Sequence, residues 1–200
     1  MGRPPGVLLA SASPRRSELL RQVGVEHEVR PVDVDETWRP GEAPVEYVLR
    51  LAEEKARVLW DRLPSDGRRP VLAADTTVAL EGEVFGKPAG RADLIEMLTR
   101  LSGRTHQVHT AVALIHPGGS AARVSSSSVT LRRIARAEME WYWSTGEPAD
   151  KAGGYAIQGL AAIFVSHVAG SYSGVVGLPL CETWELLADV PCLVTGGAAA

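Results

Sequence analysis

The sequence predicts an α/β fold, in which strands and helices alternate along the chain. Short apolar runs at residues 7–10 and 71–74 have the length and composition of buried strands. Between them, apolar residues recur at helical spacing over residues 48–63. The chain has 200 residues, of which 45% are hydrophobic, which is enough for a sizeable core. We therefore expect a single domain over residues 1–194 and a disordered, small-residue tail at 195–200.

The first two helices are marked by signals at their ends. Ser13 and Pro14 follow the first strand and predict a helix start, because serine is a preferred N-cap residue and proline fits the first helical position. Gly24 is placed to end this helix in the left-handed conformation. A second helix is expected to begin near Pro44 and to carry the apolar stripe, which Lys55 interrupts.

The rest of the chain continues the alternation. The run at residues 71–74 leads through Asp75 into a further apolar stretch, and Glu81-Gly82 then indicates a hairpin turn. A third helix around Leu98 is expected to stop at Gly103. The other expected elements are strands at 108–115 and 124–131, a helix with Met139, Tyr142 and Trp143, a strand over 162–168 and a helix near 180–187.

Charge and cysteine content limit the partners and the compartment. The 24 acidic and 21 basic residues give a net charge of −3, so no global positive field exists to hold a nucleic-acid polymer. Cys181 and Cys192 lack the spacing of a disulfide framework or a zinc site, and we interpret both as thiols. No apolar run approaches the roughly 20 residues that span a bilayer, and no targeting segment is recognisable. We expect a cytoplasmic protein without membrane contact, as a monomer or a homodimer.

The segment from Ser11 to Arg16 is the first candidate binding site. It joins a strand end to a helix start, where free N–H groups and the positive end of the helix dipole favour a phosphate. Arg15 and Arg16 add charge-assisted hydrogen bonds. Cations in a first turn oppose the dipole, so a bound anion explains the pair more readily than helix stability does. Two solvated surface arginines are an equally good interpretation of this segment taken alone.

Two lysines are further candidates. Lys55 lies between Leu51 and Leu59 on the helical stripe, so its stem is expected to cross apolar surface with the ammonium at a cleft edge. The usual explanation of such a lysine is an ammonium that reaches solvent. Lys87, between Gly86 and Pro88, is equally weak alone, because a lysine beside a turn is usually solvated. Neither lysine identifies a site by itself.

The candidate carboxylates are Asp75 and Glu36. Asp75 follows an apolar run, and the carboxyl ends of strands in open α/β sheets commonly line a ligand crevice. A carboxylate there can hold a divalent metal or accept a proton from water, although a lone aspartate is more often a turn residue. Glu36 forms an acidic cluster with Asp33 and Asp35. Such a cluster is usually solvated, but hard cations prefer clustered carboxylate oxygens.

A glycine-rich segment at residues 150–159 completes the set. Dense glycines usually mark turns, and they also permit close approach of the backbone to a ligand. Gln158 offers one donor and one acceptor, which suits the edge of a nucleobase.

Together these segments closely resemble the Maf family of nucleotide pyrophosphatases, over nearly the whole chain. Each segment alone is only moderately specific, but seven in the same order make coincidence hard to credit. The matching stretches are LASASPRRSELL near the N-terminus, LAEEKA at 51–56, AADTTV around Asp75, GEVFGKP ending in Lys87-Pro88, LSGRTHQV at 101–108, EPADKAGGYAIQG at 147–159 and GSYSGVVGLPLCET at 170–183.

The resemblance implies a fold and an activity. The fold is α/β, with a mixed, twisted central sheet flanked by helices and a deep substrate cleft between two lobes, related to the inosine triphosphatase architecture. The activity is hydrolysis of a nucleoside triphosphate between its α- and β-phosphates, with a divalent cation such as Mg²⁺, Mn²⁺ or Co²⁺. Expulsion of pyrophosphate builds negative charge that cations stabilise, and a carboxylate must orient or deprotonate water, so the residue types present suit this chemistry.

The resemblance also implies roles for individual residues. Asp75 would act as the base toward water and, with Glu36, bind the metal. Three positions, Arg16, Thr76 and Gln158, would select the substrate. The phosphates would be held by Ser11, Ser13, Arg15, Arg16, Lys55 and Lys87.

The sequence DKAGGYAIQG resembles the branch that acts on dTTP and UTP. Gln158 can donate to a carbonyl and accept from N3–H, a pattern that uracil and thymine share. Gly154 and Ala156 depart slightly from that branch, which leaves open whether canonical or modified pyrimidines are preferred. The alternative function is a nucleotide-binding regulator of septum formation with little turnover. Binding alone would not need Asp75, Glu36 and both lysines together, so an enzyme is favoured.

Overall fold

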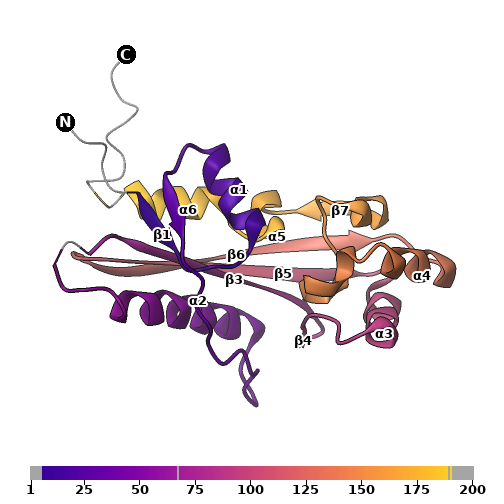
Figure 1. Cartoon of the computed structure of the whole chain (residues 1–200). Coiled ribbons are helices and arrows are strands. Elements are labelled where there is room, and N and C mark those ends of the chain that lie inside the picture. The colour runs from indigo at the N-terminus through magenta and orange to yellow at the C-terminus, as the bar shows by residue number, and fades with distance from the viewer. Residues whose placement is uncertain (1–5, 67, 189, 191–200) are drawn as a thin grey trace.

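The computed structural model describes residues 6–66, 68–188 and 190, and over these residues the chain folds around one seven-stranded mixed sheet (Figure 1). The strand order is β2-β1-β3-β5-β6-β7, and β4 pairs with β3. Strands β1 (Val7–Leu9), β2 (His27–Val29) and β3 (Val71–Leu80) pair in parallel, and the other pairs are antiparallel. The α/β fold with a mixed central sheet is confirmed.

Three long strands form the middle of the sheet. They are β3, β5 (Thr105–His116) and β6 (Gly119–Leu131), and they run along the length of the molecule in Figure 1. Both β5 and β6 extend beyond the apolar cores from which they were predicted, because backbone hydrogen bonds continue between polar residues such as Thr105 and Thr130. An alternating or polar strand end carries no apolar run that would mark it in the sequence.

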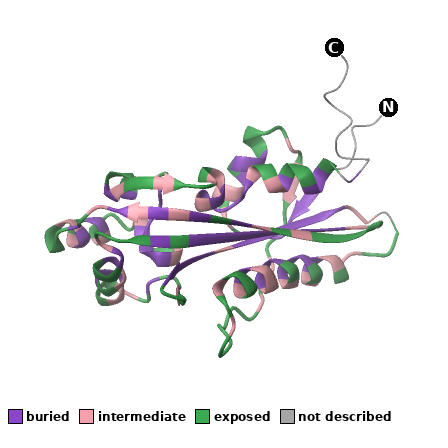
Figure 2. Cartoon of the chain, turned by 180° about the vertical axis from the view of Figure 1, so that it is seen from behind, coloured by how far each residue is buried: buried purple, intermediate pink, exposed green. Residues whose placement is uncertain are grey.

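Helices cover both faces of one end of the sheet. Helix α2 (Pro44–Asp61) packs against β3 and β5 on one face. On the opposite face lie α1 (Pro14–Gln22), α5 (Tyr172–Val176) and α6 (Leu180–Ala188), as Figure 1 shows. Buried residues gather where these helices meet the sheet, and the outer helix surfaces are exposed (Figure 2).

The remaining elements lie at the other end of the long strands. They form a second group beside β5 and β6 (Figure 1). These elements are β4 (Glu83–Phe85), α3 (Arg91–Leu101), α4 (Arg136–Ser144), β7 (Val165–Ala169) and the 3-10 helices η1 (Glu147–Asp150), η2 (Ala152–Gly154) and η3 (Leu160–Phe164). The two groups are the two lobes that the resemblance implied.

The sheet separates two hydrophobic clusters, and β3 contributes to both. Ala73 belongs to the cluster under α2, whereas Leu72 and Ala74 belong to the larger cluster on the opposite face. Side chains along a strand alternate between faces. Asp75 therefore faces α2, and Thr76 faces α1 and α5.

Two sequence predictions need correction. The strand expected over residues 162–168 begins only at Val165, because residues 160–164 form the 3-10 helix η3. Asp75 does not end a strand: β3 continues through it to Leu80. Its polar run Asp75-Thr76-Thr77 is tolerated within the strand because each residue keeps its register with β5.

Two short elements carry no clear signal in the sequence. Strand β2 and helix α5 were not predicted, because they are short and carry no extended periodic pattern.

Within the described part of the chain, no helix is both long and apolar enough to cross a membrane. Cys181 is a free, exposed cysteine. The predicted thiol at Cys192 and the predicted disordered tail at 195–200 lie outside the described residues.

Candidate active site

A cleft of about 650 Å³ opens between the two groups of elements. It is lined from one side by the start of α1 and by α2, and from the other by the segment after β4 and the glycine-rich segment at 150–158. The cleft brings together every candidate residue that the sequence pointed to, although their roles stay predictions. These residues are Ser11, Ser13, Arg15, Arg16, Glu36, Lys55, Asp75, Thr76, Lys87 and Gln158.

A gap in the sheet edge places β3 at the base of this cleft. Strand β1 pairs with β3 only as far as Leu72, and β4 begins to pair with it at Val78. Between these pairings, residues 73–77 have no strand partner on this edge within the described chain. Side chains from both faces of β3 can therefore reach one ligand, which explains how Asp75 and Thr76 line the same cleft.

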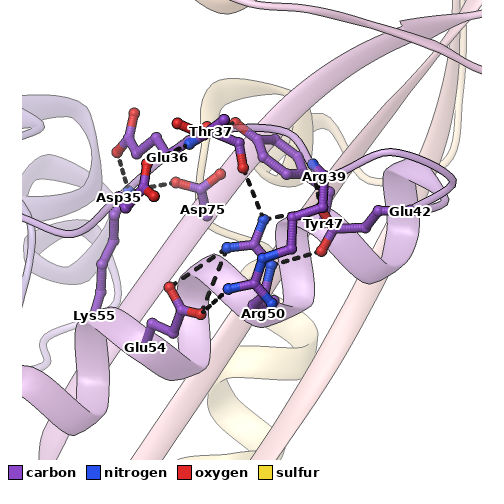
Figure 3. Close-up of polar contacts among 10 residues, drawn as sticks. All are labelled: Asp35, Glu36, Thr37, Arg39, Glu42, Tyr47, Arg50, Glu54, Lys55 and Asp75. Carbon is purple, nitrogen blue, oxygen red and sulfur yellow. Dashed lines mark hydrogen bonds and ion pairs between the residues drawn. The ribbon is translucent and has the colours of Figure 1, made fainter.

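Lys55 lies between two carboxylates at the centre of the site. Its Nζ donates to Asp75 Oδ1 and to Glu36 Oε1, each at 2.6 Å (Figure 3). The side chains of Lys55 and Asp75 are each only 11% exposed, whereas that of Glu36 is 47% exposed. The interpretation of Lys55 as a solvated lysine is therefore wrong, and the turn interpretation of Asp75 is wrong as well.

Lys55 also sets the ionisation of Glu36. Partial burial raises the pKa of the Glu36 carboxyl, but the hydrogen bond and the charge of Lys55 outweigh this and hold that pKa below its usual value. Glu36 is thus a carboxylate at neutral pH, and its exposed side faces the cleft. An ionised carboxylate beside a buried ammonium forms a charged centre beside the polar run of β3.

Arg16 is held by neutral groups rather than by an acid. Its Nε donates to the Gly177 carbonyl oxygen at 2.8 Å, Nη1 to Ser11 Oγ at 2.9 Å and Nη2 to Thr76 Oγ1 at 3.3 Å. Burial lowers the pKa of this guanidinium, although the nearby charge of Asp75 opposes the shift. Among the described residues Arg16 forms no ion pair, so its positive charge is available to an anion in the cleft.

Thr76 links Arg16 to the interior of the sheet. Its Oγ1 lies 3.0 Å from Thr110 Oγ1, within hydrogen-bond distance, and the Thr110 hydroxyl donates to the Gly174 carbonyl oxygen at 2.7 Å. Ser11 Oγ accepts from the Ser13 backbone N–H at 3.2 Å in addition to Arg16. The guanidinium plane is therefore fixed from three sides, which suits the recognition of a ligand by shape as well as by charge.

Three further cations line the cleft. Arg15 pairs with the exposed Asp150 at 3.5 Å, and Asp150 is also bonded to Lys151, whose side chain is only 14% exposed. Lys87 is exposed and forms no ion pair with any described residue. Sequence reasoning missed Lys151 and Asp150 as individual site residues, although both belong to the segment it singled out. Arg15, Lys87 and Lys151 form a cation-rich rim that joins the two lobes.

Gln158 presents an unpaired amide to the cleft. It is exposed and has no hydrogen-bond partner in the described structure. The backbone before it is held in place, because the Gly153 N–H donates to the Gly86 carbonyl oxygen at 3.0 Å. A free amide on a fixed segment is suited to reading a ligand edge by hydrogen bonds.

The carboxylates suit a metal ion that arrives with a phosphate ligand. Over the described residues, no group of three or more His, Cys, Asp or Glu side chains could hold an ion alone. Mg²⁺ is usually held by one or two carboxylates together with substrate phosphates and water. Glu36 and Asp75, which meet at Lys55, fit that donor set.

Comparison with known proteins decides the family. A family model described as "Maf-like protein" matches residues 6–190. The chain belongs to the Maf family. Maf relatives with high similarity are each named dTTP/UTP pyrophosphatase. The proteins from Alkalilimnicola ehrlichii and Bordetella parapertussis are 54% and 53% identical to this chain and cover 92% of it and 92% of their own length. That from Nitrosomonas europaea is 49% identical, with coverage of 92% and 93%.

Among solved structures, the Maf chain is similar to the Ham1 protein of Staphylococcus aureus. The TM-score is 0.42 at 18% sequence identity, with 62% of this chain and 71% of the other covered. This partial overlap assigns neither a fold family nor a function.

Proposed function

We propose that this Maf protein is a nucleoside triphosphate pyrophosphatase that hydrolyses dTTP and UTP to the monophosphate and pyrophosphate. The observation that carries the proposal is the contact of Lys55 with both Asp75 and Glu36, at 2.6 Å each, in a cleft rimmed by cations. Relatives about half identical to the chain carry the matching name. A free thiol at Cys181 agrees with a cytoplasmic enzyme.

The reaction needs an activated water and a stabilised leaving group. In our proposal, Asp75 accepts the proton of the water that attacks the α-phosphorus. The bond from that phosphorus to the bridging oxygen breaks, and its electron pair leaves with pyrophosphate. Lys55, Lys87 and the two cleft arginines offset the charge that builds there. Lys55 also holds the Asp75 carboxylate in one orientation, because the two are hydrogen-bonded.

Glu36 and Asp75 would hold a divalent cation together with the phosphates of the substrate. When bound, Mg²⁺, Mn²⁺ or Co²⁺ would neutralise part of the phosphate charge. Glu36 and Asp75 are the residues that would hold it, since their carboxylates converge and Glu36 is still partly exposed. We therefore expect turnover to require an added divalent cation.

Base selection is assigned to Gln158, with Arg16 and Thr76. The Gln158 amide can donate to a carbonyl and accept from N3–H, and thymine and uracil carry both groups. Cytosine lacks the N3–H, and guanine presents adjacent donors. A bound base covers the Gln158 amide, and a wrong base would leave that covered amide unpaired, which costs roughly 1–3 kcal/mol.

The test is pyrophosphate release from dTTP, UTP, CTP, GTP and a modified pyrimidine triphosphate, with and without metal. We expect kcat/KM to be highest for dTTP and UTP and activity to vanish in excess EDTA. Gln158→Glu should damage dTTP and UTP turnover, because a carboxylate repels the neighbouring base carbonyl. Gln107→Glu is the matched control, since Gln107 is exposed on β5 and its side chain bonds, within the described structure, only to Ser128.

Other outcomes would reject parts of the proposal. Stoichiometric orthophosphate would show attack at the γ-phosphorus and remove the assigned reaction. Tight nucleotide binding without turnover would favour a regulatory protein. Faster turnover of the modified pyrimidine than of dTTP would identify removal of modified nucleotides as the task.

A further inference from the structure

We propose that Arg50 is a positioning residue that fixes the loop at residues 36–42, and with it the Glu36 carboxylate, against Lys55 and Asp75. This inference rests on the proposed function, in which Glu36 binds the catalytic cation. Arg50 does not line the cleft itself. Its contacts are drawn in Figure 3.

The loop that carries Glu36 has no regular structure of its own. Residues 30–39 belong to no helix or strand, so no helix or sheet ladder holds this backbone. Glu36 is nonetheless within 2.6 Å of Lys55. Groups outside the loop must therefore hold its backbone, because a free loop would lose conformational entropy to keep this contact.

Arg50 supplies most of these contacts from the side of α2. Its Nε and Nη2 donate to the two Glu42 carboxylate oxygens at 2.6 and 2.8 Å, which is the paired geometry of a strong arginine–carboxylate bond. Nη2 also donates to the Thr37 carbonyl oxygen at 3.2 Å. The Arg50 and Glu42 side chains are only 13% and 10% exposed. Hydrogen bonds from Arg50 lower the pKa of Glu42 to about 2, so this pair stays ionised at neutral pH.

Tyr47 holds the neighbouring carbonyl. Its hydroxyl donates to the Glu36 carbonyl oxygen at 2.9 Å, and its ring lies 5.6 Å from the Arg50 guanidinium carbon. The carbonyls of Glu36 and Thr37 are thus held by two residues of one helix turn. At the far end of the loop, the Trp38 indole N–H donates to the Glu42 carbonyl oxygen at 2.9 Å.

The same helix carries the cation that Glu36 contacts. Tyr47, Arg50 and Lys55 all belong to α2, which packs on β3 and β5. Helix α2 therefore sets the backbone position of Glu36 and the position of its partner together. Loss of the Arg50 contacts should loosen Glu36 without removing any group from the cleft.

The test is Arg50→Lys, which keeps the charge and loses the fork that binds Glu42 and Thr37 together. We expect kcat for dTTP to fall about tenfold while KM changes less than about twofold, because a displaced carboxylate affects the metal-dependent step more than nucleotide binding. The Mg²⁺ concentration for half-maximal rate should rise. Arg136→Lys is the matched control, since the Arg136 side chain is 69% exposed and pairs, among the described residues, only with Glu140 of α4.

A double-variant cycle separates this role from a general structural one. If Arg50 acts through Glu36, Arg50→Lys should lower kcat no further once Glu36→Gln is present. Tyr47→Phe should behave in the same way and removes only a hydroxyl, so it tests the proposal should Arg50→Lys fold poorly. Amide hydrogen exchange over residues 36–42 should be about tenfold faster in either single variant.

The outcomes distinguish this proposal from the proposed function. The positioning role alone is overturned if the wild-type protein releases pyrophosphate and both single variants match it in kcat and in amide exchange. It is also overturned if the loss of kcat in a double variant equals the product of the losses in Glu36→Gln and in the other single variant. Wild-type protein inactive on every triphosphate rejects the proposed function, and the exchange comparison still decides whether Arg50 holds the loop.

Discussion

The interpretation of Lys55 changes once its neighbours in the structure are known. On α2 it occupies the apolar stripe, where a lone lysine usually places its ammonium in solvent. Here the ammonium is buried against Asp75 and Glu36. A buried charge needs partners, because an unpaired one would cost several kcal/mol. The three side chains therefore depend on one another, and removal of one leaves the others with unbalanced charge.

At this scale we predict that Asp75→Asn abolishes turnover. The amide keeps the shape of the side chain but loses its basicity, and a general base typically contributes about 10²- to 10⁴-fold in rate. Nucleotide affinity should stay within about tenfold, a change of no more than ~1.4 kcal/mol in binding free energy. Steady-state kinetics and calorimetric titration measure the two quantities.

Asp93→Asn is the matched control for this prediction. Asp93 has a local structural contact, in which its carboxylate accepts from the Ala89 N–H at 2.7 Å. Its variant should retain wild-type kcat. An active Asp75→Asn protein would show that Asp75 is not the base.

At the scale of elements, the site depends on where strands stop pairing. Strand β3 is continuous, but its edge is covered by β1 and β4 only at its two ends. The glycine-rich segment closes the far side of the gap, with Gly153 close to Val78 of β3. This approach requires glycine, because Gly153 has a φ of 67° and an added Cβ would lie 2.9 Å from Val78 Cγ2.

We predict that Gly153→Ala destabilises the protein more than Gly146→Ala does. Both glycines are left-handed, with φ of 67° and 75°, but a Cβ at Gly146 would meet nothing within 4 Å. Gly146→Ala should lower the free energy of unfolding by about 1–2 kcal/mol, the cost of a left-handed L-residue. Gly153→Ala should add about 1–3 kcal/mol for the contact with Val78. Urea unfolding measures both, and equal losses would contradict the close approach.

At the scale of the whole molecule, a buried polar pair joins the glycine-rich segment to the sheet. His106 on β5 is 1% exposed, and its Nε2 lies 2.7 Å from the hydroxyl of Tyr155, which lines the cleft. Burial lowers the pKa of His106 to about 4 and raises that of Tyr155. Both side chains are therefore neutral at pH 7, and the fold holds an uncharged histidine against Tyr155, outside the lining of the cleft.

This histidine predicts an acid-dependent loss of stability. The folded-state pKa of His106, about 4, is below the value of about 6.5 expected in the unfolded chain. Its contribution is complete above pH 6.5 and is lost as the pH falls toward 4, because the unfolded state binds the proton first. At pH 5 the loss should be about 2 kcal/mol relative to pH 7.

The measurement compares urea unfolding at pH 7 and pH 5. His106→Gln keeps a hydrogen-bonding side chain but cannot titrate in this range. Between pH 7 and pH 5, the free energy of unfolding of this variant should therefore fall by about 2 kcal/mol less than that of the wild type. The same pH dependence in both proteins would show that His106 is not held neutral by the fold.

Local patterns were sufficient to predict most elements and the identity of the candidate residues. Backbone preferences of single residues set the helix starts at Pro14 and Pro44 and the hairpin turn at Glu81-Gly82. These features can therefore be recognised from the local sequence. The family resemblance was likewise readable from short segments, and the match over residues 6–190 confirms it. Elements without a strong local signal, such as β2 and η3, were missed or misplaced.

The partners of each charged residue depended on the tertiary structure. No local signal shows that Lys55 faces Asp75, because the two are separated by 20 positions and meet only when α2 packs on β3. The same holds for Arg16, whose neutral partners Thr76 and Gly177 come from distant elements. Sequence patterns report periodicity and backbone preference, whereas charge pairing in a cleft depends on which strand edge is left open. In this chain that edge is residues 73–77 of β3, which have no strand partner there among the described residues because β1 is short and β4 begins late.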